Sequence, residues 1–320
     1  MKILFTGASS FTGYWFVKEL HEAGHTVVAT FRLEADQYKS IRHARVVRLL
    51  DLVRPVFNCP FGGERFIELV ESDSQWDVLC HHAADVANYK SPAFDVLAAV
   101  ENNCRDVNQI LKLLTARDCF RIVFTGSVFE PGEGAGSNGL PAISAYGLSK
   151  ALTAQMLVFY GRLHGLKIGK FVIPNPFGPY EDPRFTAYLI RSWFEHNTPT
   201  VNTPEYVRDN IHVTLLAKAY REFVECLSSG PGYCQTHPSG YIESQGAFAS
   251  RFAQQMHVRL NIACPVEICR QTSFDEPHVR INIDPVVRRG IDWDECRAWD
   301  EIAEFYQNLL LPIASSSPCP

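Results

Sequence analysis

An apolar segment, a glycine-bearing turn and a helical segment follow one another at the start of the chain, and this succession constrains the fold more than any other feature. Residues 2–6 are apolar and end at Gly7, which predicts a buried strand. Residues 12–23 carry apolar residues at helical spacing and stop at Gly24. Residues 26–31 form a β-branched run. A strand, turn, helix and strand of this length predict a βαβ unit with parallel strands.

The same alternation continues through the first half of the chain. Further strands are predicted at 44–50, 77–80, 120–125 and 167–174, and helices at about 64–71, 94–115 and 145–164. This order predicts an α/β fold, a doubly wound parallel sheet of the Rossmann type. Prolines break the pattern after Asn175. We therefore expect an NAD(P)-binding Rossmann domain at 1–174 and a smaller C-terminal substrate-binding lobe at 175–320, some of whose segments return to the sheet, with a frayed tail at 314–320.

Composition excludes several classes of protein. Hydrophobic residues make up 46% and charged residues 20%, as in folded soluble domains. The net charge is 30 − 35 = −5 without a Lys/Arg block, which argues against nucleic acid as a partner. No apolar run approaches the ~18 residues of a membrane span, and the apolar start is too short for a signal peptide, so we expect a cytoplasmic protein. The ten cysteines show no Cys-x-x-Cys spacing, which indicates reduced thiols and no metal site.

The turn Thr6-Gly7-Ala8-Ser9-Ser10-Phe11-Thr12-Gly13 lies where a Rossmann fold binds a dinucleotide pyrophosphate. It resembles the Thr-Gly-x-x-Gly-x-x-Gly loop of the extended short-chain dehydrogenase/reductase family, the NAD(P)-dependent nucleotide-sugar epimerases and dehydratases. Ser10 stands where that family has its middle glycine. The resemblance implies cofactor contacts from Gly7, Ser9, Ser10, Phe11, Thr12 and Gly13.

The end of the second strand bears on the choice of cofactor. NAD-selective members have an acidic residue there, which accepts hydrogen bonds from the ribose 2′-hydroxyl. This strand ends in Arg32, and no acid follows until Glu34. An arginine suits the 2′-phosphate of NADP, so we expect NADP, with NAD as the alternative. The resemblance also implies cofactor contacts from Asp51 and Leu52 after the third strand, and from His82, Ala83 and Ala84 after the fourth.

Tyr146 and Lys150 are four residues apart on a predicted helix and so share one face. A neighbouring ammonium lowers a phenol pKa from its reference of about 10, which makes Tyr146 a candidate general acid and base. Lys150 would also hold the nicotinamide ribose. A Ser or Thr at the end of the preceding strand should bind the reacting oxygen. The family places it three residues before a Val-aromatic pair, which gives Thr125, and Ser127 is the alternative.

Three further segments resemble the family's substrate-binding motifs. Asn175, in Asn-Pro-Phe-Gly-Pro, matches an asparagine that contacts the nucleotide-sugar, and Arg208 matches an arginine that contacts its diphosphate. Arg280 and the run 288–293 match the C-terminal signature. The implied substrate-binding set is Thr125, Ser127, Asn175, Arg208 and Arg280. The resemblance also implies a homodimer through the helices at 94–115 and 145–164.

The residues after Thr125 reduce the number of reactions that the chain is expected to catalyse. Dehydratases of this family carry an Asp-Glu pair there and decarboxylating members a Glu, whereas this chain has Gly126 and Ser127. The expected activity is hydride transfer at C4 of a nucleotide-diphosphate sugar, by a 4-keto-sugar reductase or a 4-epimerase, and NADP favours the reductase. The alternative is a non-catalytic NADP-binding sensor or scaffold, against which the Tyr146–Lys150 pair argues.

Overall fold

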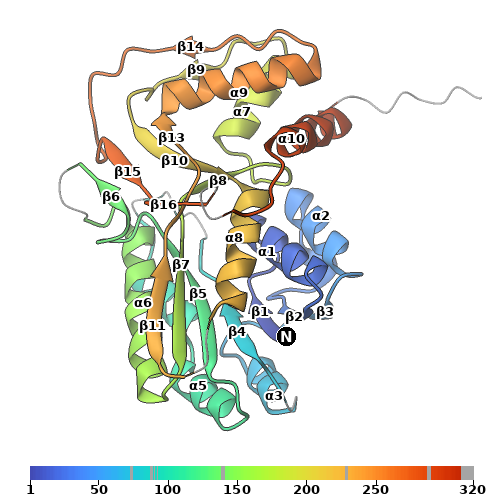
Figure 1. The fold of residues 1–320 in the computed structure, drawn as a ribbon, viewed down its shortest axis with the longest axis vertical. Helices are drawn as coiled ribbons and strands as arrows, with labels where there is room; N and C mark the ends of the chain where they lie inside the picture. Colours follow the sequence, from blue (N-terminus) through green and yellow to red (C-terminus); the bar gives the residue numbers. More distant parts are fainter. Residues whose placement is uncertain are drawn as a thin grey trace, which may run out of the picture.

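The computed structural model describes residues 1–72, 75–86, 89, 91, 93–137, 141–227, 230–286 and 290–310; the predicted tail at 314–320, Arg288 and Arg289 lie outside the described residues. Its main sheet has the strand order β11-β7-β5-β4-β1-β2-β3, and every pairing is parallel (Figure 1). The strands are β1 (Lys2–Thr6), β2 (Thr26–Thr30), β3 (Arg54–Val56), β4 (Val78–His81), β5 (Arg121–Ser127), β7 (Lys167–Ile173) and β11 (Gly232–Thr236). This sheet confirms the expected Rossmann-type fold.

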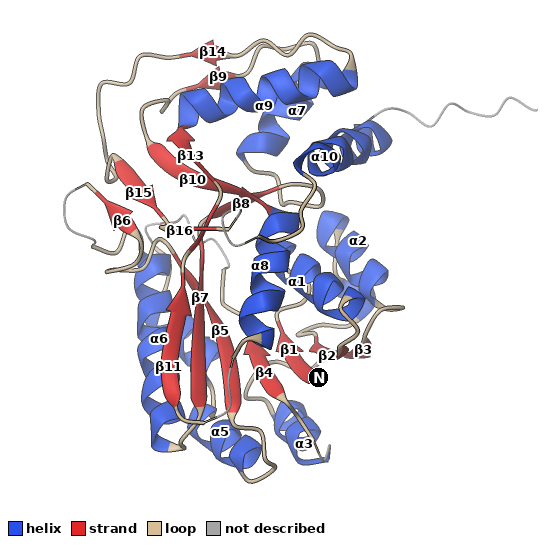
Figure 2. Cartoon of the chain, viewed as in Figure 1, coloured by secondary structure: helices blue, strands red, loops and turns tan. Residues whose placement is uncertain are grey.

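Helices cover both faces of the sheet, and the alternation of side chains along the strands explains why (Figure 2). Ile3 and Phe5 of β1 point into one core, which α1 (Phe11–Glu22), α2 (Ser40–Leu49) and α8 (Val213–Glu225) complete. Leu4, between them, belongs to the opposite core. That core is completed by α3 (Glu64–Ser72), α4 (Val96–Cys104), α5 (Val107–Thr115) and α6 (Ala145–Leu163).

A smaller lobe stands on the carboxyl ends of these strands. Its sheet runs β13-β10-β15-β6, with β8 paired to β10. The lobe has its own aromatic core, including Phe177, Phe252 and Trp299. Its elements are β6 (Ala135–Gly136), β8 (Asn175–Phe177), β10 (Val207–His212), β13 (Tyr241–Ser244), β15 (Val279–Ile281), α7 (Phe185–Phe194), α9 (Gln245–Leu260) and α10 (Glu295–Leu310). Two short pairs, β9 (Thr200–Val201) with β14 (Glu267–Ile268) and β12 (Pro238–Ser239) with β16 (Asp284–Pro285), join the connections, and η1 (Ala35–Gln37) follows β2.

Two segments beyond residue 175 belong to the main sheet and its covering helices, not to the smaller lobe. Strand β11 forms the edge of the main sheet beside β7. Helix α8 packs on α1, where the rings of Phe16 and Tyr220 stack with centroids 4.1 Å apart. The chain therefore passes between the Rossmann-type part and the smaller lobe more than once. Residues of both parts form the junction between them.

Two predicted elements are wrong. Residues 44–50, expected to be a strand, belong mostly to helix α2, because Arg45, Val46 and Leu49 turn inward at helical spacing. The third strand is instead the short edge strand β3. The helix expected at 94–115 is two helices, because Asp106 adopts a left-handed conformation with φ 50° between α4 and α5. Aspartate is among the few residues that tolerate this conformation.

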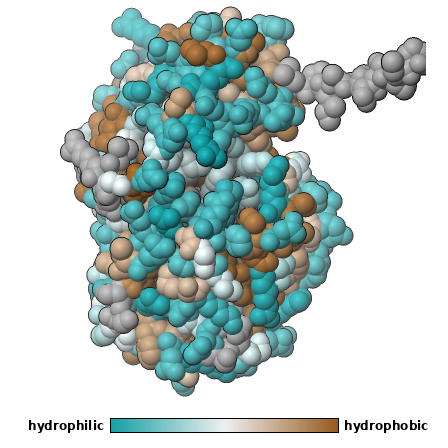
Figure 3. All heavy atoms as spheres, turned by 45° about the vertical axis from the view of Figure 1, so that its right-hand side comes forward, coloured by the Kyte–Doolittle hydropathy of each residue, from teal (hydrophilic) through white to brown (hydrophobic). Residues whose placement is uncertain are grey.

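The surface seen in Figure 3 is mostly hydrophilic, with apolar residues in separate patches. Within the described residues, none of the helices combines the length and the apolar character that crossing a membrane requires.

Candidate active site

The loop between β1 and α1 is shaped to receive an anion. Gly7 has φ +82°, and a Cβ there would lie 2.6 Å from the backbone nitrogen of Ala83, so a side chain is excluded on both counts. Ser10 caps α1, because its hydroxyl accepts from the Gly13 amide at 3.1 Å and donates to the Gly7 carbonyl at 2.9 Å. The first turn of α1 has no acidic residue. Its free amides and dipole therefore fit the pyrophosphate of a dinucleotide.

Ser10 fits this loop without strain. Its backbone has φ −75° and ψ 166°, which any residue adopts, so the position does not require the glycine that the family places there. Its side chain turns back into the loop toward the imidazole of His82. The departure from the family pattern thus adds a polar contact within the loop.

His81 is the last residue of β4 and His82 follows it, and the two side chains make different contacts. His81 is buried, with Nδ1 3.0 Å from the Thr6 hydroxyl and Nε2 3.1 Å from the Asn103 carbonyl. His82 lies between the loop and β5, 2.8 Å from the Thr125 hydroxyl. The Ala83 amide donates to Thr6 at 3.1 Å. The segment expected to line the cofactor therefore lies directly against the phosphate loop.

Thr125 and Ser127 lie near the carboxyl end of β5, on the same side of the strand. Thr125 is buried, and its hydroxyl meets His82. The Ser127 hydroxyl accepts from the Phe129 amide at 3.2 Å and so closes the turn that follows. Of the two hydroxyls, that of Thr125 is the one linked to the phosphate loop.

Tyr146 and Lys150 lie in the first turns of α6, which Ser144 caps by accepting from the Gly147 amide at 3.1 Å. The Tyr146 ring meets those of Tyr89 and Phe94 edge-on, with centroids 5.5 and 6.3 Å away. Burial, and then the charge of Glu130, raise the pKa of Tyr146 above its ordinary 10, while burial lowers the pKa of Lys150. The expected lowering of the Tyr146 pKa is thus wrong, because burial dominates and keeps the phenol neutral.

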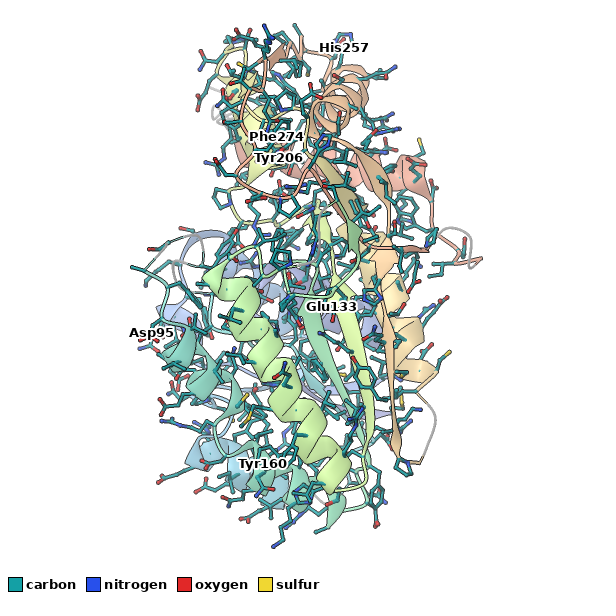
Figure 4. The ribbon with its side chains drawn as sticks, turned by 90° about the vertical axis from the view of Figure 1, so that its left-hand side faces the viewer. Asp95, Glu133, Tyr160, Tyr206, His257 and Phe274 are labelled. Atoms are coloured by element: carbon teal, nitrogen blue, oxygen red, sulfur yellow. The ribbon has the colours of Figure 1, made fainter. Side chains whose placement is uncertain are left out.

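Four buried titratable side chains, Glu130, Glu133, Lys170 and His237, form an ion cluster beside this helix. Lys170 of β7 donates to Glu130 at 2.5 Å and to Glu133 at 2.6 Å, and Glu133 in turn lies 2.6 Å from His237 Nε2. A Cβ on Gly126 would lie 2.5 Å from Lys170 Cε, so only glycine leaves room for the lysine stem. Figure 4 labels Glu133 near the level where the sheet meets the lobe. A hollow of about 770 Å³ lies between this cluster and α6.

No residue of the ion cluster was among the predicted site residues. Its members come from positions 130, 133, 170 and 237, which share no motif. A weak signal existed, since a lysine inside the otherwise apolar strand 167–173 demands a buried partner.

The lobe places the expected substrate ligands Asn175, Arg208 and Arg280 in adjacent strands, but the two arginines have protein partners. Arg208 of β10 and Arg280 of β15 are register partners. Arg208 donates to Glu276 at 2.9 Å and to the carbonyls of Val207, Pro277 and His278. Arg280 is fully buried and donates to the carbonyls of Val128 and Glu130. It therefore holds the turn after β5. Asn175, in β8, has a buried amide nitrogen without a partner among the described residues.

In a Rossmann-type fold the adenosine end of a dinucleotide is expected where β2 and β3 finish. Arg32 is exposed directly after β2 and Phe31. Asp51 and Leu52 do not lie there, because the third strand begins only at Arg54 and they precede it. The structure thus puts them at the amino end of β3, whereas dinucleotides bind at carboxyl ends. Asn58, just past the carboxyl end and 2.5 Å from Glu34 Oε1, occupies the place that had been assigned to them.

Among the described residues, no group of three or more His, Cys, Asp or Glu side chains is arranged to hold a metal ion.

Comparisons with known proteins bear on the family and the fold of the chain. The model of the NAD-dependent epimerase/dehydratase family matches residues 3–233. No curated protein sequence gave a match. Among solved structures, UDP-glucuronic acid 4-epimerase from Bacillus cereus, in complex with UDP-glucuronic acid and NAD, is similar with a TM-score of 0.75 at 16% identity, over 97% of this chain and 100% of that one. UDP-glucose 4-epimerase from Thermotoga maritima, with UDP-glucose, has a TM-score of 0.71 at 18% identity over the same shares.

A third structure, UDP-glucose 4-epimerase from Bifidobacterium longum in complex with NAD⁺ and UDP, has a TM-score of 0.72 at 17% identity over 96% of this chain and 98% of that one. At these identities the likeness establishes the fold that the chain shares with them.

Proposed function

Because the chain belongs to the NAD-dependent epimerase/dehydratase family, we propose that it transfers a hydride at C4 of a nucleotide-diphosphate sugar, as a 4-keto-sugar reductase or a 4-epimerase. The observation that carries this proposal is the placement of Thr125. Its hydroxyl lies at the end of β5, is linked through His82 to the phosphate loop, and is followed by the helix that carries Tyr146 and Lys150. Thr125, Tyr146 and Lys150 supply a hydroxyl, a phenol and an ammonium, which are groups that suit the handling of a sugar alcohol.

A bound NAD or NADP would supply the hydride acceptor and donor. Gly7, Ser10 and the amides at the start of α1 would hold its pyrophosphate. Lys150 would hold its nicotinamide ribose. Arg32, exposed after β2, supports NADP through a contact with the 2′-phosphate, while the relatives crystallised with NAD keep NAD as the alternative.

In the reducing direction, Tyr146 is the acid. Tyr146 Oη would give its proton to the ketone oxygen of the 4-keto sugar, while a bound NADPH or NADH would supply the hydride for the new C4–H bond. The neutral phenol is the form that this proton transfer needs. An epimerase would first run this step in reverse, and the reverse step starts from a Tyr146 phenolate that has already given its proton to solvent. The charge of Lys150 would stabilise this phenolate, and Oη would become a neutral phenol again on accepting the proton of the 4-hydroxyl.

Purified protein, NADPH and a 4-keto nucleotide-sugar test the proposal through the nicotinamide absorbance. Tyr146→Phe should lower kcat by about 10²–10⁴-fold, because it removes only the proton carrier, and should leave cofactor affinity unchanged. Tyr160→Phe, later on the same helix (Figure 4), is the matched control. Full turnover by Tyr146→Phe would refute the mechanism.

A second comparison separates the two hydroxyls. Thr125→Val should reduce the rate of the chemical step far more than Ser127→Ala, because the Ser127 hydroxyl oxygen already accepts from the Phe129 amide in the turn after β5. The reverse order would assign the reacting oxygen to Ser127.

We also propose a homodimer through α4 and α6. The outer face of α6 carries Phe159 and Leu163, each 63% exposed, and Leu97 of α4 is 78% exposed. Figure 4 looks onto α6, which no other helix covers from that side. Large apolar side chains at this exposure favour association with a second copy, as the family resemblance implies.

A further inference from the structure

The imidazole of His82 joins the phosphate loop to the reacting end of β5. Its Nδ1 lies 2.8 Å from Thr125 Oγ1. Its Nε2 lies 3.0 Å from both Ser10 Oγ and Thr12 Oγ1. The rings of Phe5 and Phe16, with centroids 5.9 and 5.3 Å away, pack against it and fix its plane. Both ring nitrogens thus meet hydroxyl groups in a site with little freedom to move.

The ring is neutral, which leaves one nitrogen with a hydrogen and the other with a lone pair. Burial, followed by the charge of Lys150, lowers the pKa of His82 from 6.5 to about 3. The ring therefore has a single N–H hydrogen to offer to its three hydroxyl neighbours. The hydrogen bonds of those neighbours determine which nitrogen carries it.

Ser10 decides the position of that proton. Its hydroxyl hydrogen is donated to the Gly7 carbonyl, and its oxygen accepts from the Gly13 amide. Ser10 therefore faces Nε2 with an acceptor, which favours the tautomer with its hydrogen on Nε2, and Thr12 Oγ1, also 3.0 Å from Nε2, can accept that hydrogen as well. Nδ1 is then the acceptor, and it takes the hydroxyl hydrogen of Thr125.

We propose that His82 is a positioning residue that holds the Thr125 hydrogen, so that Thr125 turns its lone pairs toward the substrate and the site favours a 4-hydroxy sugar over its 4-keto form. A sugar hydroxyl has a hydrogen to donate to Thr125 Oγ1. A ketone oxygen has none, so it must compete with His82 Nδ1 for the Thr125 hydrogen. This inference rests on the proposed function, because it takes Thr125 as the group that binds the reacting oxygen.

The test compares two affinities in combinations that cannot react. UDP-glucose is titrated with NADH present, and UDP-4-keto-6-deoxyglucose with NAD present. His82→Leu should shift the ratio of the two dissociation constants about tenfold toward the ketone, which is what one neutral hydrogen bond is worth. A purely structural role would change both constants alike and leave the ratio as it is, which would overturn the inference.

Two further variants sharpen the result. His82→Asn places an amide oxygen near the Nδ1 position and should keep the wild-type ratio, whereas His82→Gln should behave like His82→Leu. In a Thr125→Val background, His82→Leu should no longer change the ratio. Persistence of the shift without the Thr125 hydroxyl would show that His82 acts by another route.

The tautomer can be tested without any sugar. Nitrogen-15 NMR of labelled protein at pH 7, with His82→Gln identifying the signal, should show a neutral ring protonated at Nε2. A ring protonated at Nδ1, or on both nitrogens, would overturn the inference. Failure of both sugars to bind would instead count against the proposed function, and the NMR result would still decide the state of His82.

Discussion

Replacing Lys170 with Met would leave two carboxylates facing each other inside the protein. Lys170 donates to Glu130 and Glu133, and the side chain of Glu130 is only 1% exposed. Burial alone would lower the pKa of Lys170, but these two carboxylates outweigh it and raise the pKa. Without the ammonium, Glu130 keeps the Ser127 amide, at 2.7 Å, and Glu133 keeps His237.

The expected cost follows from that arrangement. Removing one partner of a buried ion pair typically destabilises a protein by about 3–5 kcal/mol, because the remaining charge stays buried without compensation. We expect Lys170→Met to lie in this range, since it strands two carboxylates and only Glu133 has a second polar side chain. Urea unfolding at pH 7, followed by circular dichroism, measures the free energy of unfolding.

Two controls isolate the charge. Lys167→Met, at the start of the same strand and half-buried, has no carboxylate partner at hydrogen-bond distance among the described residues and should change stability by less than about 1 kcal/mol. Adding Glu130→Gln and Glu133→Gln to Lys170→Met should restore part of the loss. A loss below about 1 kcal/mol for Lys170→Met would refute the reasoning, because it would mean that the carboxylates simply take up protons at little cost.

Three other outcomes are expected. Arg32→Ala should weaken NADPH binding far more than NADH binding, and equal losses in fluorescence titrations would remove the case for NADP. Phe159→Glu, with Leu163→Glu as a second variant, should convert a dimer into a monomer in light scattering, and a wild-type monomer at micromolar concentration would refute the interface. Burial raises the pKa of Glu181 from 4.5 to about 7, so its contribution to stability is complete below pH 4.5 and is lost as the pH rises through 7. The difference in unfolding free energy between pH 5 and 8 should therefore be smaller in Glu181→Gln, and an unchanged difference would exclude Glu181 as its source.

The elements that the sequence predicts well are those whose signal is local. The strand, loop and helix at 2–22 and the helix carrying Tyr146 and Lys150 are encoded in short, contiguous patterns. The third strand was missed because Arg54-Pro55-Val56 has neither an apolar run nor alternation, and a proline is tolerated there only because β3 is an edge strand. The Val46-Val47 pair favours a strand, so the third strand was predicted at 44–50, mostly within what is helix α2. Because the adenosine contacts are expected just after the third strand, they were predicted at Asp51 and Leu52.

Contacts between distant elements could not be predicted in the same way. Nothing in the sequence around Arg280 indicates that its guanidinium donates to carbonyls of the turn at 128–130. The break between α4 and α5 at Asp106 lacks the glycine or proline that usually marks one. These features depend on which segments meet in space, and the local pattern carries no record of that.

Gly126 shows how such a contact shapes chemistry. In the sequence, a glycine after Thr125 meant only the absence of the acid–base pair that the family's dehydratases carry. In the structure, the space beside Gly126 is filled by the stem of Lys170, with Cε 2.5 Å from where a Cβ would be, and Glu130 Oε1 is 3.0 Å away. An acidic side chain there would displace the lysine that neutralises Glu130 and Glu133. The ion cluster therefore leaves no room at position 126 for the carboxylate that the family's dehydratases carry, which supports the proposed hydride transfer over a dehydration.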